Sequence, residues 1–133
     1  MEYDASENDL FDRGNLIFQY TRKQAIADGV LIDLSSSFPS DSRLFTRSLC
    51  CTHSVWVLIE TAAECEQVEV GMYVWDLCWM CFMAVNAVKE SHCSEVDFRV
   101  CLPIGTPEKQ LKLVCSPGDE GEQVLTIMLP GED

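Results

Sequence analysis

Residues 72–88 read M-Y-V-W-D-L-C-W-M-C-F-M-A-V-N-A-V, and almost every one of them is apolar. Only Asp76 and Asn86 interrupt the run. A helix that is apolar on all sides is normally buried inside a globular domain. We therefore expect a core helix at about residues 72–90, with the rest of the chain arranged around it. Its apolar stretch before Asn86 is shorter than the roughly 20 residues that span a bilayer, so the sequence predicts no membrane association.

The last third of the chain changes from helical to alternating periodicity. In residues 95–103, apolar Val96, Phe98 and Val100 alternate with charged neighbours, which is typical of a half-buried strand. Residues 110–115 and 124–129 alternate in the same way, and they flank the turn-forming sequence P-G-D-E-G-E. Three consecutive strands of this kind predict an antiparallel meander that packs one face on helices.

Two short apolar segments near the N-terminus, residues 16–20 and 30–34, have the composition of strands. Between them, Thr21 is placed to cap a two-turn helix over residues 22–28, and Gly29 is placed to end it in a left-handed conformation. This is too short a connection for an ordinary parallel crossover, so the pairing of the two strands stays open.

The segment between these strands and the core helix divides into a loop and a helix. Residues 35–42 are rich in serine, as loops are, and residues 43–66 carry apolar residues at helical spacing with a break near Thr52 and His53. The expected fold is α+β: a four- to five-stranded, mainly antiparallel sheet packed on two or three helices. It forms one domain over residues 16–133, preceded by an acidic and flexible arm at residues 1–15.

The chain is strongly acidic, with 22 acidic and 9 basic residues and a formal net charge of −13. Direct binding of nucleic acid requires a cationic surface, so we do not expect it. Such a net charge favours solubility and can attract a basic protein surface. The sequence alone does not decide between these two roles of the charge. The carboxylates expected to contact a partner lie near the end of the 43–66 helix and in the last turn: Glu60, Glu64, Glu66, Glu69, Asp119, Glu120 and Glu122.

Eight cysteines occur without a recognisable export signal at the acidic N-terminus. We therefore expect reduced, mostly buried thiols and a cytoplasmic protein. Cys78 and Cys81 form a C-x-x-C pair, and His92 and Cys93 follow it. A metal or redox site made from these four residues is an alternative, but the pair lies on an apolar helix and the spacing matches no zinc ribbon.

Motifs that mark common enzymes do not occur in the sequence: there is no G-x-x-x-x-G-K, G-x-G-x-x-G, H-E-x-x-H or G-x-S-x-G. The sequence therefore predicts a non-enzymatic protein with no catalytic residues, no cofactor and no metal.

Two segments carry a family resemblance: Y-T-R-K-Q-A-I-A-D-G-V-L-I-D-L-S at residues 20–35 and C-S-P-G-D-E-G-E-Q-V-L-T-I-M-L-P-G-E-D at residues 115–133. With them the chain resembles a family of small bacterial, plasmid and phage proteins known as a domain of unknown function, from which it departs at Cys115-Ser116. The resemblance implies a mobile genetic element, where small acidic proteins often antagonise host defence. The first motif either specifies the fold or forms a site from Tyr20, Arg22, Gln24, Asp28 and Asp33.

Three functions follow as hypotheses. The first is an acidic inhibitor that occupies a basic surface of a nucleic-acid-binding defence complex of CRISPR-Cas or restriction type in a bacterial host. The second is an accessory or regulatory plasmid or phage protein without nucleic-acid mimicry, and the third is the metal or redox protein. We also expect the excess apolar surface of the core helix to be buried by a neighbouring helix or in a homodimer.

Overall fold

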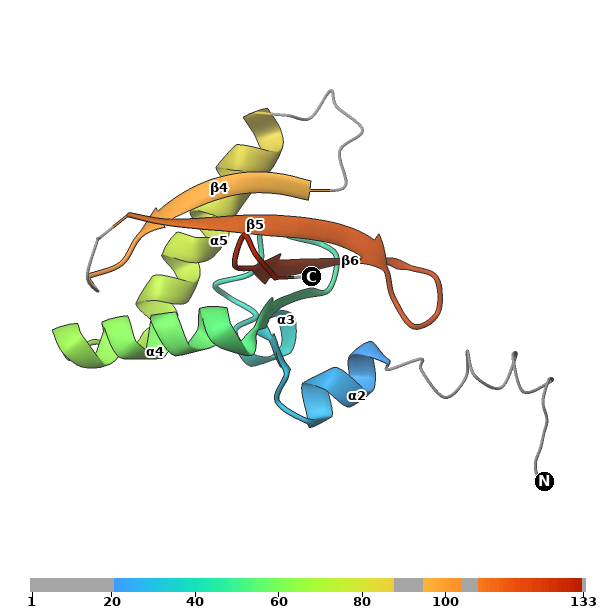
Figure 1. The fold of residues 1–133 in the computed structure, drawn as a ribbon, viewed down its shortest axis with the longest axis horizontal. Helices are drawn as coiled ribbons and strands as arrows, with labels where there is room; N and C mark the ends of the chain where they lie inside the picture. Colours follow the sequence, from blue (N-terminus) through green and yellow to red (C-terminus); the bar gives the residue numbers. More distant parts are fainter. Residues whose placement is uncertain (1–20, 88–94, 104–107, 133) are drawn as a thin grey trace.

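A five-stranded sheet with the strand order β2-β3-β6-β5-β4 forms the centre of the fold. The computed structural model describes residues 21–87, 95–103 and 108–132. The strands are β2 (Leu31–Asp33), β3 (Leu49–Thr52), β4 (Glu95–Cys101), β5 (Glu108–Pro117) and β6 (Gln123–Met128). The helices are α2 (Arg22–Ala27), α3 (Leu34–Ser37), α4 (His53–Glu66) and α5 (Val70–Ala87) (Figure 1). The predicted α+β fold is confirmed.

Antiparallel pairing predominates, as expected. β4 pairs with β5 and β5 with β6 in the predicted meander, and β2 pairs with β3, all antiparallel. The exception is β3, which lies parallel to β6 and so joins the N-terminal strands to the meander. The strand expected at residues 16–20 and the arm at residues 1–15 lie outside the described residues.

The core lies between the sheet and the helices α4 and α5. Alternate residues of the strands face these helices, as shown by the burial of Phe98, Leu111 and Ile127 in one cluster with Ile59 and Leu77. The chain therefore has one main apolar layer, and the two longest helices are on the same side of the sheet. Figure 1 shows α5 crossing β4 and β5, with α4 below it.

The predicted helix at residues 43–66 is wrong in its first part. Leu49–Thr52 forms the strand β3, and α4 begins at His53, where the Thr52 hydroxyl accepts a hydrogen bond from the Val55 N–H at 3.4 Å. The break expected near these residues is therefore real. A short apolar run such as L-C-C-T has no periodicity that separates strand from helix, and its pairing with β6 decides its conformation.

The loop expected at residues 35–42 begins with a short helix instead. Asp33 accepts a hydrogen bond from the Ser36 N–H at 3.1 Å and starts α3, which spans Leu34–Ser37. A single turn of this kind depends on its cap and on the complete burial of Leu34, and neither is visible in a serine-rich composition.

The core helix is confirmed as α5, but it is buried along only one side. Val74, Leu77, Cys78 and Cys81 are buried in it, and Tyr73, Trp75 and Phe82 are half-buried. Four other large apolar residues of this helix are exposed: Met72 59%, Trp79 43%, Met80 41% and Met83 49%. Among the described residues, α4 does not cover that side. α5 is also the one described helix that is long and apolar enough to cross a membrane by length and composition.

Candidate functional site

The residues of the Y-T-R-K-Q-A motif build and end helix α2. The Thr21 hydroxyl accepts a hydrogen bond from the Gln24 N–H, and the Gln24 side chain accepts one from the Thr21 N–H, each at 3.0 Å. This reciprocal capping box satisfies two N–H groups that a helix start would leave unpaired. Gly29, at φ +81°, follows the last turn as expected. Gln24 is thus used inside its own helix, and Tyr20 lies outside the described residues.

Arg22 joins this motif to the C-terminal strand. Its Nη1 donates to the Thr126 Oγ1 and its Nη2 donates to the Leu125 carbonyl oxygen, both at 2.8 Å. Leu125 belongs to the core cluster on the α5 side, so the alternation of β6 places Thr126 on the opposite face of the sheet. Arg22 therefore packs against the sheet face that α4 and α5 leave open.

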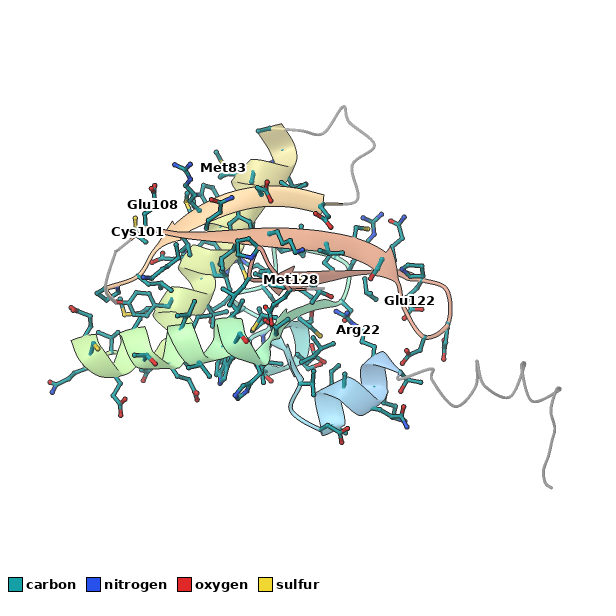
Figure 2. The ribbon with its side chains drawn as sticks, viewed as in Figure 1. Arg22, Met83, Cys101, Glu108, Glu122 and Met128 are labelled. Atoms are coloured by element: carbon teal, nitrogen blue, oxygen red, sulfur yellow. The ribbon has the colours of Figure 1, made fainter. Side chains whose placement is uncertain are left out.

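Asp119 makes a second connection between the two ends of the chain. Its Oδ1 accepts from the Arg22 N–H at 2.8 Å and its Oδ2 accepts from the Lys23 N–H at 3.1 Å. These two hydrogen bonds, with the nearby cationic groups of the same residues, hold the pKa of Asp119 below its ordinary value. The two motifs of the family resemblance thus meet at the N-terminus of α2 (Figure 2 labels Arg22 and the neighbouring Glu122).

Asp33 and Asp28 also belong to the predicted motif site, but they lie apart from Arg22's contacts. Asp33 caps α3 through the Ser36 N–H and also accepts from the Ser36 hydroxyl at 2.9 Å. Asp28 is exposed at the C-terminal end of α2. Arg22, Gln24 and Asp33 each form hydrogen bonds within the chain, which supports the interpretation that the motif specifies the fold.

An open cavity of about 800 Å³ lies beside Asp28 on the side of β6 that carries Thr126. Glu132, which lines it, accepts hydrogen bonds through one carboxylate oxygen from the Thr52 hydroxyl and the Leu129 N–H, both at 2.8 Å. Sequence reasoning missed Glu132 and this cavity. A glutamate near the end of a chain has no local signal of a contact with residue 52, because that contact exists only once β3 and β6 pair.

The seven carboxylates expected to contact a partner form two separate groups. Glu60, Glu64, Glu66 and Glu69 lie on the second half of α4 and the connection to α5, and we call these four the α4 acidic patch. Asp119, Glu120 and Glu122 lie on the β5–β6 hairpin, at the opposite end of the long axis (Figure 1). All seven are exposed, but the structure does not bring them together into one surface.

The carboxylates of the hairpin group are partly used by the hairpin itself. Asp119 caps α2, and Glu122 accepts a hydrogen bond from the Glu120 N–H at 2.9 Å. Gly118 allows this arrangement, since a Cβ at that position would lie 2.5 Å from a carboxylate oxygen of Glu122. These two side chains therefore stabilise the turn, as the turn interpretation of P-G-D-E-G-E requires.

The α4 acidic patch contains a shallow hollow. The hollow has a volume of about 420 Å³, and Glu60 and Glu64 line it together with apolar Ala63, Val68 and Val70. No lysine or arginine occurs in the sequence between Arg47 and Lys89, so the chain places no basic residue of these elements beside the two carboxylates. Glutamates one turn apart repel one another mildly unless a cation lies between them.

The C-x-x-C pair lies inside the core. Cys78 and Cys81 are both fully buried, and burial raises the pKa of the Cys78 thiol to about 12 and that of Cys81 further still. Reactive and metal-binding cysteines need a thiolate, so these two residues serve packing. Within the described ranges, no three His, Cys, Asp or Glu side chains are grouped to hold a metal, and His92 and Cys93 lie outside those ranges.

Comparisons of this chain with models of known families, with characterised proteins and with solved structures found no match.

Proposed function

We propose that this chain is a non-enzymatic binding protein whose α4 acidic patch holds basic side chains of a partner protein. The observation that carries the proposal is the hollow that Glu60 and Glu64 line together with Ala63, Val68 and Val70. Lysine and arginine side chains bury an aliphatic stem on apolar surface and keep a charged end for carboxylates. A hollow lined by both carboxylates and apolar side chains suits both parts of such a side chain.

The charge of the whole chain supports the same proposal. A net charge of −13 produces a negative field that attracts a basic surface and raises the rate of encounter. The basic surfaces of nucleic-acid-binding proteins are natural targets for such a field. The resemblance described above extends the proposal to a nucleic-acid-binding defence complex of a bacterial host, which the chain would inhibit in the cytoplasm by covering its nucleic-acid-binding surface.

The experiment is a pull-down with the tagged chain and the double variant Glu60→Gln/Glu64→Gln. A bacterial host lysate is applied at ~0.05 M and ~0.5 M salt, because screening shortens the range of exposed charges steeply over that interval. We expect wild type to retain a nucleic-acid-binding protein at low salt, the high salt to release it, and the variant not to retain it. The purified partner should then lose nucleic-acid binding when wild type is added.

The matched control removes the same amount of charge elsewhere. Glu7→Gln/Glu120→Gln neutralises two carboxylates that do not belong to the α4 acidic patch, and we expect it to bind as wild type does. Equal retention by wild type and Glu60→Gln/Glu64→Gln would contradict the proposal and favour an accessory protein whose charge serves solubility. Equal loss of partner binding in both double variants would show that binding depends on the net charge of the chain and not on the hollow.

A further inference from the structure

Strand β4 has an open and regular edge. It pairs with β5 through seven consecutive residue pairs, from Glu95 with Val114 to Cys101 with Glu108, without an interruption of the register. It is the last strand of the sheet, so within the described part of the chain its other edge has no strand beside it. A regular strand edge presents unpaired N–H and C=O groups that readily pair with another chain.

The exposed side of α5 lies next to this edge. Trp79 and Met80 line a hollow of about 220 Å³ together with Arg99, Val100 and Cys101 of β4. In Figure 1 the last turns of α5 extend past β4 on the side away from β5, and Figure 2 labels Met83 there. Trp79 and Met80 of α5 thus lie on one surface with the edge strand β4, which Asp76 and Glu108 also line.

The sequence of β4 is self-complementary. When a second copy of E-V-D-F-R-V-C is laid antiparallel so that Phe98 lies opposite Phe98, Asp97 lies opposite Arg99 in both directions and Val96 lies opposite Val100. Residues directly opposite one another lie on the same face of a sheet, and opposite charges stabilise such pairs. Registers centred on Asp97 or Arg99 would place like charges opposite each other.

We propose that two copies of this chain form a dimer by antiparallel pairing of their β4 strands around Phe98, with the exposed sides of their α5 helices packed together. This register keeps the helices of both copies on the same face of the joined sheet. In a dimer with a two-fold axis, both copies contribute the same surface to the interface. A strand that is complementary to itself meets this requirement. The proposal does not depend on the α4 acidic patch.

The first test is a cysteine cross-link. In the proposed register Glu95 lies opposite Cys101 of the second copy, and both residues are exposed. Directly opposed residues of an antiparallel pair have Cα atoms about 4.5–5.5 Å apart, which is within the range of a disulfide. We expect Glu95→Cys to form a covalent dimer on mild oxidation of the full chain. The control Glu95→Cys/Cys101→Ser should stay monomeric on a non-reducing gel, and a cross-link that persists in it would overturn the register.

The second test measures mass by sedimentation at about 0.15 M salt, where the Debye length is about 8 Å and the repulsion between two acidic chains is screened. We expect wild type to sediment at twice its mass of 15.0 kDa. Arg99→Asp should weaken association at least tenfold, and the exchange Asp97→Arg/Arg99→Asp should restore it. Met83→Glu should also weaken association, whereas Val57→Glu, on an exposed position of α4, should not. A monomeric wild type at every concentration tested would overturn the proposal.

Discussion

The carboxylate of Asp119 accepts a hydrogen bond from the backbone N–H of Arg22 at 2.8 Å, across 97 positions of the sequence. The same arginine reaches Thr126 and Leu125 on β6. Arg22 and Asp119 therefore both connect helix α2 to the β5–β6 hairpin. The two sequence motifs at opposite ends of the chain form one structural unit.

Asp119→Asn should destabilise the protein in a pH-dependent way. The folded pKa of Asp119 is lowered, so its charge stabilises the folded state above the unfolded value of about 3.9. That stability is lost as the pH falls through the lower folded pKa. Urea unfolding from pH 7 to pH 3 should show a wild-type advantage that is constant at high pH and shrinks below about pH 4. Glu120→Gln in the same turn is the control, and an advantage that persisted at low pH would contradict the prediction.

Arg22→Ala should lower the free energy of unfolding by about 1–3 kcal/mol, because the Leu125 carbonyl and the Thr126 hydroxyl lose their partner in a partly buried place. Urea denaturation monitored by tryptophan fluorescence gives this value. Lys23→Ala, at the next and exposed position, should change it by less than about 0.5 kcal/mol. Similar losses in the two variants would show that Arg22 acts through general charge and not through its contacts.

Glu132→Ala should release the end of the chain from β3. One of its oxygens accepts hydrogen bonds from both Thr52 and Leu129, and their removal should cost about 1–2 kcal/mol. Glu132→Gln keeps an acceptor oxygen and should recover most of that loss. Hydrogen exchange at the Leu129 amide reports the contact directly. Unchanged protection in Glu132→Ala would mean that this hydrogen bond does not hold the terminus.

The two sides of α5 should respond differently to truncation. Leu77→Ala removes a fully buried side chain from the core cluster and should cost about 2–5 kcal/mol. Met72→Ala removes a side chain of the same helix that is 59% exposed in the single chain, and in protein dilute enough to be monomeric it should cost less than about 0.5 kcal/mol. Urea unfolding of both variants in dilute protein measures the contrast. Comparable costs would show that the exposed side of α5 is covered within the single chain.

The cysteines should separate into two reactivity classes at pH 8. Burial raises the pKa of Cys50 to about 11 and that of Cys78 to about 12, so both thiols stay protonated and unreactive at that pH. Cys65 and Cys101 are exposed and should be alkylated first by iodoacetamide. Mass spectrometry of peptides from native and urea-treated protein locates the labels. Rapid labelling of Cys78 in the native protein would support the metal or redox alternative.

Local features of the chain could be predicted because they depend on neighbours in the sequence. Thr21 and Gly29 mark the beginning and end of α2 within a few residues, and the alternation of residues 95–103 identifies β4 and its buried face. The meander followed from the same alternation in β5 and β6. Helix capping and side-chain periodicity depend on residues close together in the sequence, so both can be predicted from the sequence alone.

The candidate site was harder to predict, because its contacts are long-range. Asp119 was expected on a partner-binding surface, and the structure gives it the cap of α2. The sequence predicts one set of partner-binding carboxylates, and the structure separates the α4 acidic patch from the hairpin group. The positions of α4 and the hairpin around the sheet decide which carboxylates lie together. The number of charged residues in the sequence does not reveal these positions.

The sequence by itself determined that this chain forms an α+β domain with an apolar helix and a C-terminal meander. Only the tertiary structure decided that Leu49–Thr52 is a strand, since its conformation comes from pairing with β6. The tertiary structure also decided which side of α5 is exposed, because a helix that is apolar all round has no preferred face. Among the described residues, Trp79, Met80 and Met83 stay exposed on α5, and Trp79 and Met80 line a hollow with β4.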